Sequence, residues 1–206
     1  MAFSDLFRKF NKKEPAQAHH TSSSTDHLGR ARQAALELLS ILRGQLAASD
    51  GSLHSGTMLC AAAWLTGTSL YRSFDFKDPS PSGTIIHSNE VNATWEGLIH
   101  LLEQYTFNKA DIPIGYLILT SMGARDFYQP HVEMLYVQSE LQARYNAVMK
   151  KHGFGYLDGA RVGILLCSIL IEQYHTARLI ELEPAAGVVA AKILEAAKTV
   201  PPALKN

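Results

Sequence analysis

One pair of side chains in this sequence has a spacing that binds metal ions in some helical proteins. Glu172 and His175 are three residues apart, so on a helix the carboxylate and the imidazole lie on one face. Di-iron and di-manganese bundles use this spacing, but each centre combines two such pairs with two further carboxylates. The sequence contains no second Glu-x-x-His pair. Glu172 and His175 therefore supply only part of a metal centre.

Other side chains of ligand type lie in the preceding predicted helices. Glu96 and His100 are four residues apart, and His131 and Glu133 offer two more. Along their helix, however, Glu96, His100 and Glu103 lie opposite the apolar stripe, which is where a solvated face is expected. We predict that these three side chains face water.

The helix that carries Glu172 has one polar stripe on an otherwise apolar surface. Arg161, Ser168, Glu172 and His175 form this stripe, and the simplest interpretation is that it is the side of the helix that faces water. The alternative is a metal-dependent or redox enzyme centred on Glu172 and His175. No cofactor is predicted from the sequence, and a bound metal ion belongs only to this alternative.

Two further features favour structural over catalytic roles. His54 lies at the start of a predicted helix, where a neutral, hydrogen-bonded imidazole is expected. Gly153, Gly155 and Gly159 are spaced like a phosphate-binding loop, but a helix and not a strand precedes them, so Gly153 is predicted to end that helix. The sequence contains neither G-x-S-x-G nor H-E-x-x-H, the motifs of many hydrolases and zinc proteases.

Both cysteines, Cys60 and Cys167, lie within apolar runs. We predict buried, reduced thiols that pack as small apolar side chains. No secretory signal precedes the chain and no CxxC spacing is present, so neither a disulfide nor a zinc site is expected. These features predict a cytoplasmic protein.

Composition limits the classes of partner. Lys and Arg total 19, as do Asp and Glu, so the formal net charge is zero, and the basic surface of a nucleic-acid-binding protein is not expected. No apolar run reaches the roughly 18 residues that a transmembrane helix needs. The 206 residues, 47% of them apolar, are enough for one full-sized hydrophobic core.

Helical periodicity predicts an all-α, single-domain bundle of about six helices over residues 27–206, with neighbouring helices mostly antiparallel. The predicted helices cover residues 28–48, 52–74, 88–107, a stretch from 130 to about 151, 159–182, and a stretch from 184 to about 200. Residues 112–122 are apolar on all sides, so periodicity leaves helix and strand open. We favour a helix there, because no convincing partner strand exists.

Residues 1–26 are predicted to form a flexible N-terminal arm. Phe3, Leu6, Phe7 and Phe10 recur at helical spacing, so residues 1–13 could form a short amphipathic helix that contacts a membrane surface or a partner. The opposing interpretation is a frayed leader, because so short a helix is marginal in water. Residues 11–26 have almost no large apolar side chains and are predicted to be a disordered linker.

A stripe of small residues occupies one face of the second predicted helix. Gly56, Cys60, Ala63 and Gly67 are spaced four, three and four residues apart, which allows another helix backbone to approach closely. The partner is a helix of this chain or a second copy of the chain, and we favour the first. The sequence thus predicts a non-enzymatic binding or assembly protein, which could form a homodimer.

Overall fold

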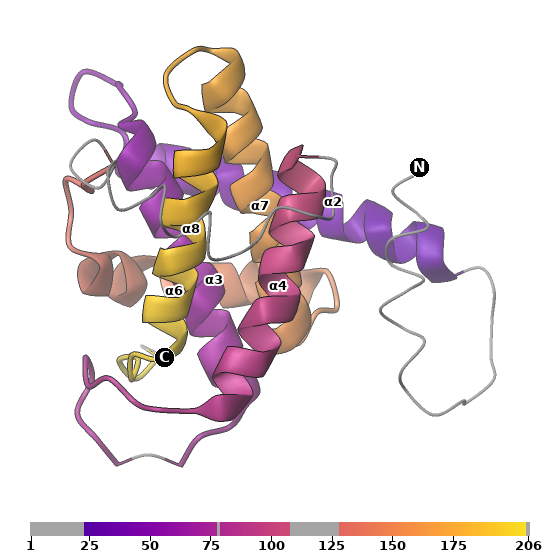
Figure 1. Cartoon of the computed structure of the whole chain (residues 1–206), viewed down its shortest axis with the longest axis vertical. Helices are drawn as coiled ribbons and strands as arrows, with labels where there is room; N and C mark the ends of the chain where they lie inside the picture. The colour runs from indigo at the N-terminus through magenta and orange to yellow at the C-terminus, as the bar shows by residue number, and fades with distance from the viewer. Residues whose placement is uncertain (1–22, 78, 108–127, 205–206) are drawn as a thin grey trace.

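The computed structural model describes residues 23–77, 79–107 and 128–204, and of residues 23–25 it describes the backbone alone. Within these ranges the predicted all-α bundle is confirmed. The helices, labelled as in Figure 1, are α2 (Ser23–Leu46), α3 (Ser55–Ser73), α4 (Asn89–Phe107), α6 (Met134–Lys151), α7 (Tyr156–Thr176) and α8 (Leu182–Ala197). The predictions for residues 1–13, for the linker up to residue 22 and for residues 112–122 lie outside the described residues.

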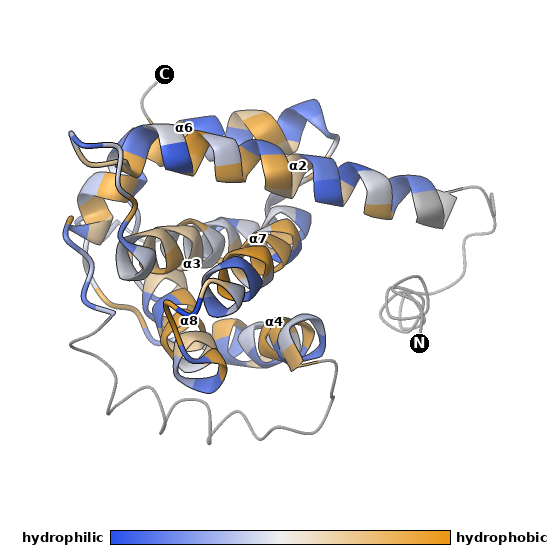
Figure 2. Ribbon diagram, turned by 90° about the horizontal axis from the view of Figure 1, so that it is seen from above, coloured by the Kyte–Doolittle hydropathy of each residue, from blue (hydrophilic) through white to orange (hydrophobic). Residues whose placement is uncertain are grey.

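The helices lie in three tiers (Figure 2). α2 and α6 form one outer tier, α3 and α7 the middle tier, and α8 and α4 the other outer tier. The helix contacts agree with this view, because α3 packs against α6, α7 and α8, while α7 packs against α2 and α4. A helix in the middle tier is covered by neighbours on both sides over much of its length, so most of its surface is expected to be apolar. Accordingly, every residue of α3 from Gly56 to Tyr71 is buried.

The small-residue stripe of α3 is covered within the chain. A Cβ added at Gly67 would lie 2.7 Å from the Cβ of Ala196, and one at Gly56 would lie 2.8 Å from the carbonyl oxygen of Tyr128. Cys60 and Ala63, between them, are buried as well. Because the missing side chains let α8 and the Tyr128 backbone approach closely, the stripe serves packing inside one copy of the chain.

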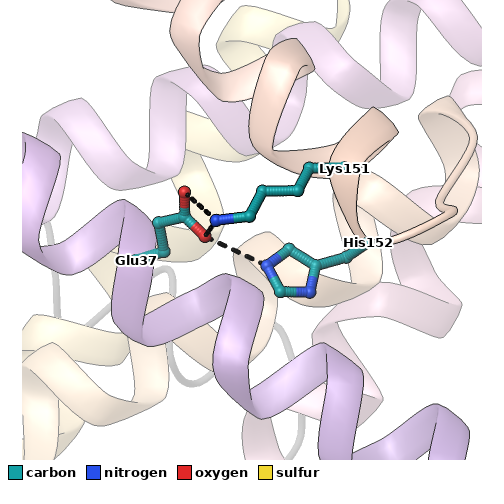
Figure 3. A network of polar contacts seen from close by, with 3 residues as sticks. All are labelled: Glu37, Lys151 and His152. Atoms are coloured by element: carbon teal, nitrogen blue, oxygen red, sulfur yellow. Dashed lines mark hydrogen bonds and ion pairs between the residues drawn. The ribbon is translucent and has the colours of Figure 1, made fainter.

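Side-chain contacts fix α2 to the turn between α6 and α7 (Figure 3). The Glu37 carboxylate accepts hydrogen bonds from Lys151 Nζ at 2.9 Å and from His152 Nε2 at 3.0 Å. About two turns earlier on α2, Arg30 donates to the backbone oxygen of His152 at 2.9 Å. Gly153 follows with a φ of +76°, a left-handed conformation that ends α6 as the sequence predicted.

The start of α6 is later than its sequence predicted. Pro130 was expected to open the helix, whereas α6 begins at Met134. The backbone N–H of His131 instead donates to Thr57 Oγ1 of α3 at 2.9 Å, and Glu133 keeps an extended conformation. This tertiary contact holds residues 128–133 as a non-helical segment beside α3, where they become part of a cavity.

A single short extended contact occurs in the described part of the chain. Ile85 and Thr199 form an isolated antiparallel bridge, with the backbone N–H of Val200 donating to Thr84 O at 2.8 Å. It ties the loop before α4 to the segment after α8. None of the described helices alone has the length and apolarity to cross a bilayer, although α6 and α7 pass that test as a pair bent by 105°.

Candidate functional site

The pair at metal-site spacing lies on the surface. The side chains of Glu172 and His175 are both exposed, and the imidazole Nδ1 of His175 lies 3.2 Å from the backbone oxygen of Ile180. Among residues 23–77, 79–107 and 128–204, no group of three or more His, Cys, Asp or Glu side chains is placed to hold a metal ion. The two residues are thus solvent-facing in the structure, while Ser168 of the same stripe is buried and donates to Ile164 O.

The prediction that Glu103 faces water is wrong. Glu96 and His100 are exposed, but the Glu103 side chain is 0% exposed and its Oε2 lies 3.0 Å from His100 Nδ1. Burial raises the pKa of the Glu103 carboxyl above its usual range, and the contact with His100 only partly offsets this effect. Since α4 packs against both α7 and α8, its buried face is wider than the single apolar stripe on which the prediction rested.

A cavity of about 630 Å³ opens between α3, α8 and the segment that leads into α6. We call it the Trp64 cavity. Its apolar lining comes from Cys60, Trp64, Tyr128, Pro130, Val132, Met134, Leu135, Val188 and Ala191, and its polar lining from Gln129, His131, Glu133, Lys192 and Glu195. Cavities of roughly 300–1,000 Å³ with mostly apolar walls and a few polar groups are typical small-molecule sites.

A chain of buried hydrogen bonds fixes the indole of Trp64. Its Nε1 donates to Gln138 Oε1 of α6 at 3.1 Å, and Gln138 Nε2 donates to Thr68 Oγ1 at 2.8 Å. The Thr68 hydroxyl in turn donates to the Trp64 backbone oxygen at 2.9 Å. Because each donor in this chain has an acceptor, the network holds the ring in one orientation at low energetic cost. The cavity thus has a preformed aromatic wall.

The indole of Trp64 already attracts a cation. Lys192 Nζ lies 5.9 Å from the ring centroid, within the distance at which an ammonium interacts with an aromatic face. The same Nζ donates to Glu195 Oε2 at 2.6 Å, so its charge is neutralised by Glu195. Glu133 forms no ion pair with any residue in the described ranges. Among the described residues that line the cavity there are two carboxylates and one ammonium, so these side chains together carry an excess of negative charge.

Cys60 is the one thiol in the described lining of the cavity, and it is not activated. Burial raises its pKa to about 11, and its Sγ lies 3.5 Å from the backbone oxygen of Tyr128, to which the thiol donates. At neutral pH the group is therefore a thiol and a poor nucleophile.

Two stacked imidazoles lie at the edge of the Trp64 cavity. The rings of His54 and His131 have centroids 3.7 Å apart and planes 11° from parallel. Thr57 connects them, since its backbone N–H donates to His54 Nδ1 at 3.2 Å and its hydroxyl accepts from the His131 backbone N–H. Burial, and secondarily the neighbouring His131, lowers the pKa of His54 below its usual value. A neutral imidazole is thus the N-terminal cap of α3.

A second cavity of about 510 Å³ adjoins the first at Tyr128, which lines both. Its other lining residues come from the end of α7, the connection that follows it and the start of α8: His175, Arg178, Leu179, Ile180, Glu181 and Pro184. We call it the Arg178 cavity. The Tyr128 hydroxyl donates to the backbone oxygen of Glu181 at 3.3 Å, so this side chain is the shared wall.

The sequence did not identify the residues of the Trp64 cavity as a site. Trp64 and Lys192 carry no motif, and they are 128 residues apart; only the packing of α8 on α3 brings them together. His131 and Glu133 were recognised as ligand-type side chains, and both line the cavity. Comparison with known proteins adds no assignment, because no family model, no curated protein and no solved structure matches this chain.

Proposed function

We propose that this protein is a non-enzymatic binding protein and that the Trp64 cavity binds a small organic cation, an amine with an apolar body. The observation that carries the proposal is the fixed indole of Trp64 in a cavity of mixed apolar and polar lining, whose described residues include more carboxylates than ammonium groups. Aromatic faces combined with carboxylates are a recurrent means of binding alkylammonium groups.

Charge favours a cationic over an anionic head group. Lys192 is already paired with Glu195, so an anion would have to displace Glu195 and then face Glu133 as well. An ammonium group would gain the unpaired carboxylate of Glu133 and could replace the Lys192 ammonium near the indole. Like-charge contacts in a partly desolvated site disfavour the anion.

The apolar lining favours a ligand with a hydrocarbon portion. Val132, Met134, Leu135 and Val188 line the cavity from three different segments, so an alkyl or aryl group inside it would be removed from water on several sides. Each buried methylene group contributes about 0.8 kcal/mol to binding. An amine of moderate size is therefore expected to bind more tightly than ammonium or methylamine.

Three probes of equal chain length test the proposal: hexylamine, hexanol and hexanoate, titrated by calorimetry into the full chain at neutral pH. We expect the order hexylamine, then hexanol, then hexanoate in affinity. Glu133→Gln should weaken hexylamine binding about 1.5-fold to fivefold, as removal of one exposed opposite charge does. Glu183→Gln, an exposed carboxylate outside the cavity, is the matched control and should leave the affinity unchanged.

The Lys192→Met variant distinguishes most clearly between a cation-binding and an anion-binding cavity. Removing the ammonium that occupies the indole face should strengthen hexylamine binding and leave hexanol nearly unaffected. If Lys192→Met instead weakens hexylamine, or if hexanoate binds wild type more tightly than hexylamine, the assignment of a cation-binding cavity is wrong.

The homodimer stays a separate prediction, as does the cytoplasmic location. Because α8 and Tyr128 cover the small-residue stripe, the proposed ligand site does not depend on self-association. Light scattering of the full chain measures the oligomeric state directly, and either result is compatible with the Trp64 cavity as a binding site.

A further inference from the structure

The Arg178 cavity contains a backbone conformation that its sequence does not favour. Arg178 follows α7 with a φ of +59°, in the left-handed region where glycine is the usual residue after a helix. Its backbone N–H donates to His175 O at 2.8 Å, and the next N–H, of Leu179, donates to Tyr174 O at 2.9 Å. The helix end is therefore well formed, but a residue with a Cβ occupies the position at a cost of about 1–2 kcal/mol.

Residues with strained backbone conformations are enriched at functional sites. The strain at Arg178 therefore suggests that its side chain has a function. Glycine at position 178 would keep both backbone hydrogen bonds and remove the strain. Arg178 lines the cavity, and no residue of the described ranges forms a hydrogen bond or an ion pair with its guanidinium.

The imidazole of His175, which lines the same cavity, is held in place by a backbone oxygen. Nδ1 of His175 lies 3.2 Å from the Ile180 backbone oxygen, and a carbonyl oxygen can only accept, so Nδ1 carries the hydrogen in this contact. The other ring nitrogen, Nε2, has no hydrogen-bond partner in the part of the chain that the structure describes. An imidazole held by a backbone carbonyl in this way presents Nε2 in a defined direction, as a hydrogen-bond acceptor.

From these observations we propose that the Arg178 cavity binds an oxyanion group, a carboxylate or a phosphate, through the guanidinium of Arg178. The imidazole of His175 adds a hydrogen bond where the oxyanion carries a hydroxyl that Nε2 can accept from, as hydrogen phosphate does and acetate does not. A guanidinium forms two parallel hydrogen bonds to two oxygens of such a group. Glu181 lines the same cavity and opposes an anion, but no ion pair joins its carboxylate to Arg178 within the described residues. This proposal goes beyond the binding of amines and does not rest on it.

Arg178→Gly tests the proposal, because it separates stability from binding. Without added anion, the variant should unfold about 2–4 °C higher than wild type, since the backbone strain is gone. The same variant should bind inorganic phosphate and acetate at least about tenfold more weakly, measured by calorimetry on the full chain at constant ionic strength with chloride as background. Arg178→Lys retains the backbone strain, so its unfolding temperature should stay near that of wild type. Because it keeps a positive charge, it should bind phosphate and acetate more tightly than Arg178→Gly does.

Two control variants complete the experiment. His175→Gln should weaken phosphate binding without raising the unfolding temperature. Arg144→Ala removes an exposed positive charge of α6 and should change neither property, which excludes a general effect of net charge. Comparison of phosphate with acetate shows which oxyanion the cavity prefers.

The proposal is wrong if neither phosphate nor acetate binds wild type more tightly than it binds Arg178→Gly. It is equally wrong if Arg144→Ala loses as much affinity as Arg178→Gly. Hexylamine affinity should be the same in wild type and Arg178→Gly. A failure of this proposal is therefore distinguishable from a failure of the amine site, which depends on Glu133 and Trp64.

Discussion

Trp64 and Gln138 are joined by a hydrogen bond of 3.1 Å from the indole Nε1 to the amide Oε1, and both side chains are buried. The bond connects α3 of the middle tier to α6 of the outer tier. It sets the orientation of the aromatic wall of the Trp64 cavity. Loss of this bond should therefore affect both the stability of the fold and the shape of the cavity.

Gln138→Leu should destabilise the protein by about 1–3 kcal/mol, because it leaves the buried Trp64 Nε1 without an acceptor. Gln142→Leu is the matched control on the same helix. Gln142 is also buried, but its Oε1 accepts no hydrogen bond from the described residues. Its Nε2 donates to Asn146 Oδ1 of the same helix, a side chain that is only partly buried, so leucine should cost less there. Urea unfolding of the two variants measures the difference, and equal destabilisation would show that the Trp64–Gln138 bond contributes little.

The fold could be predicted from sequence to a large extent, because helix periodicity depends on local spacing. α3 was predicted over residues 52–74 and spans Ser55–Ser73. Errors appear where tertiary contacts override local preference. Pro130 is a favourable first residue for a helix, yet the bond from the His131 backbone to Thr57 delays the start of α6. Glu103 was misplaced for a related reason, since α4 packs against two neighbouring helices and so buries more than one stripe of its surface.

The glycine positions offer a stability test of the close approach between α3 and α8. Gly67→Ala should destabilise by about 1–3 kcal/mol, because the added methyl overlaps Ala196 and the α8 backbone. Gly44→Ala in α2 is the control. A Cβ there meets nothing within 4 Å, so alanine should stabilise the helix by about 0.5–1 kcal/mol. Thermal unfolding distinguishes the two, and a neutral Gly67→Ala would contradict the packing described above.

Protonation of His54 should weaken the fold in mild acid. Its pKa is lowered in the folded state, so the unfolded chain binds the proton more tightly. The stabilising contribution is therefore complete above about pH 6.5, the ordinary value of histidine, and is lost as pH falls toward the lowered folded value. The physical reason is that a protonated Nδ1 can no longer accept from the Thr57 N–H, and that a positive charge at a helix N-terminus is unfavourable.

His54→Asn is the informative variant for this effect. Asparagine caps helix N-termini well and does not titrate. Between pH 7.5 and 5, the variant should lose less stability in urea unfolding than wild type does. An identical pH dependence of stability in the two proteins would show that protonation of His54 does not cause the loss of stability in mild acid.

The stabilising contact of Glu37 with Lys151 and His152 should be lost at a lower pH than the contribution of His54. Hydrogen bonds from Lys151 and His152 lower the pKa of Glu37, so its contribution is present above the ordinary glutamate value of about 4.3 and is lost as pH falls through the folded value. About a third of the carboxylate side chain is exposed, so solvent screening limits the effect to about 1 kcal/mol or less. Glu37→Gln should reduce stability at pH 7 and not at pH 3, with salt diminishing the difference.

The residues of the Trp64 cavity could not be predicted as a site, and the reason is physical. A cavity arises where helices pack imperfectly around a segment with its own tertiary anchors, here residues 128–133. Periodicity reports which face of a helix is buried, but not where two buried faces leave space. The emphasis on Glu172 and His175 followed spacing on one helix, whereas Trp64, Glu133 and Lys192 come from three segments.

The emission of Trp64 is the most direct measurement of the proposed binding. The chain has two tryptophans, and Trp95→Phe leaves Trp64 as the only one. We predict that hexylamine changes this emission saturably and at lower concentration than hexanol, and that Glu133→Gln shifts the hexylamine curve to higher concentration. Unchanged Trp64 emission at saturating hexylamine, with the protein folded, would contradict the assignment of this cavity as a cation-binding site.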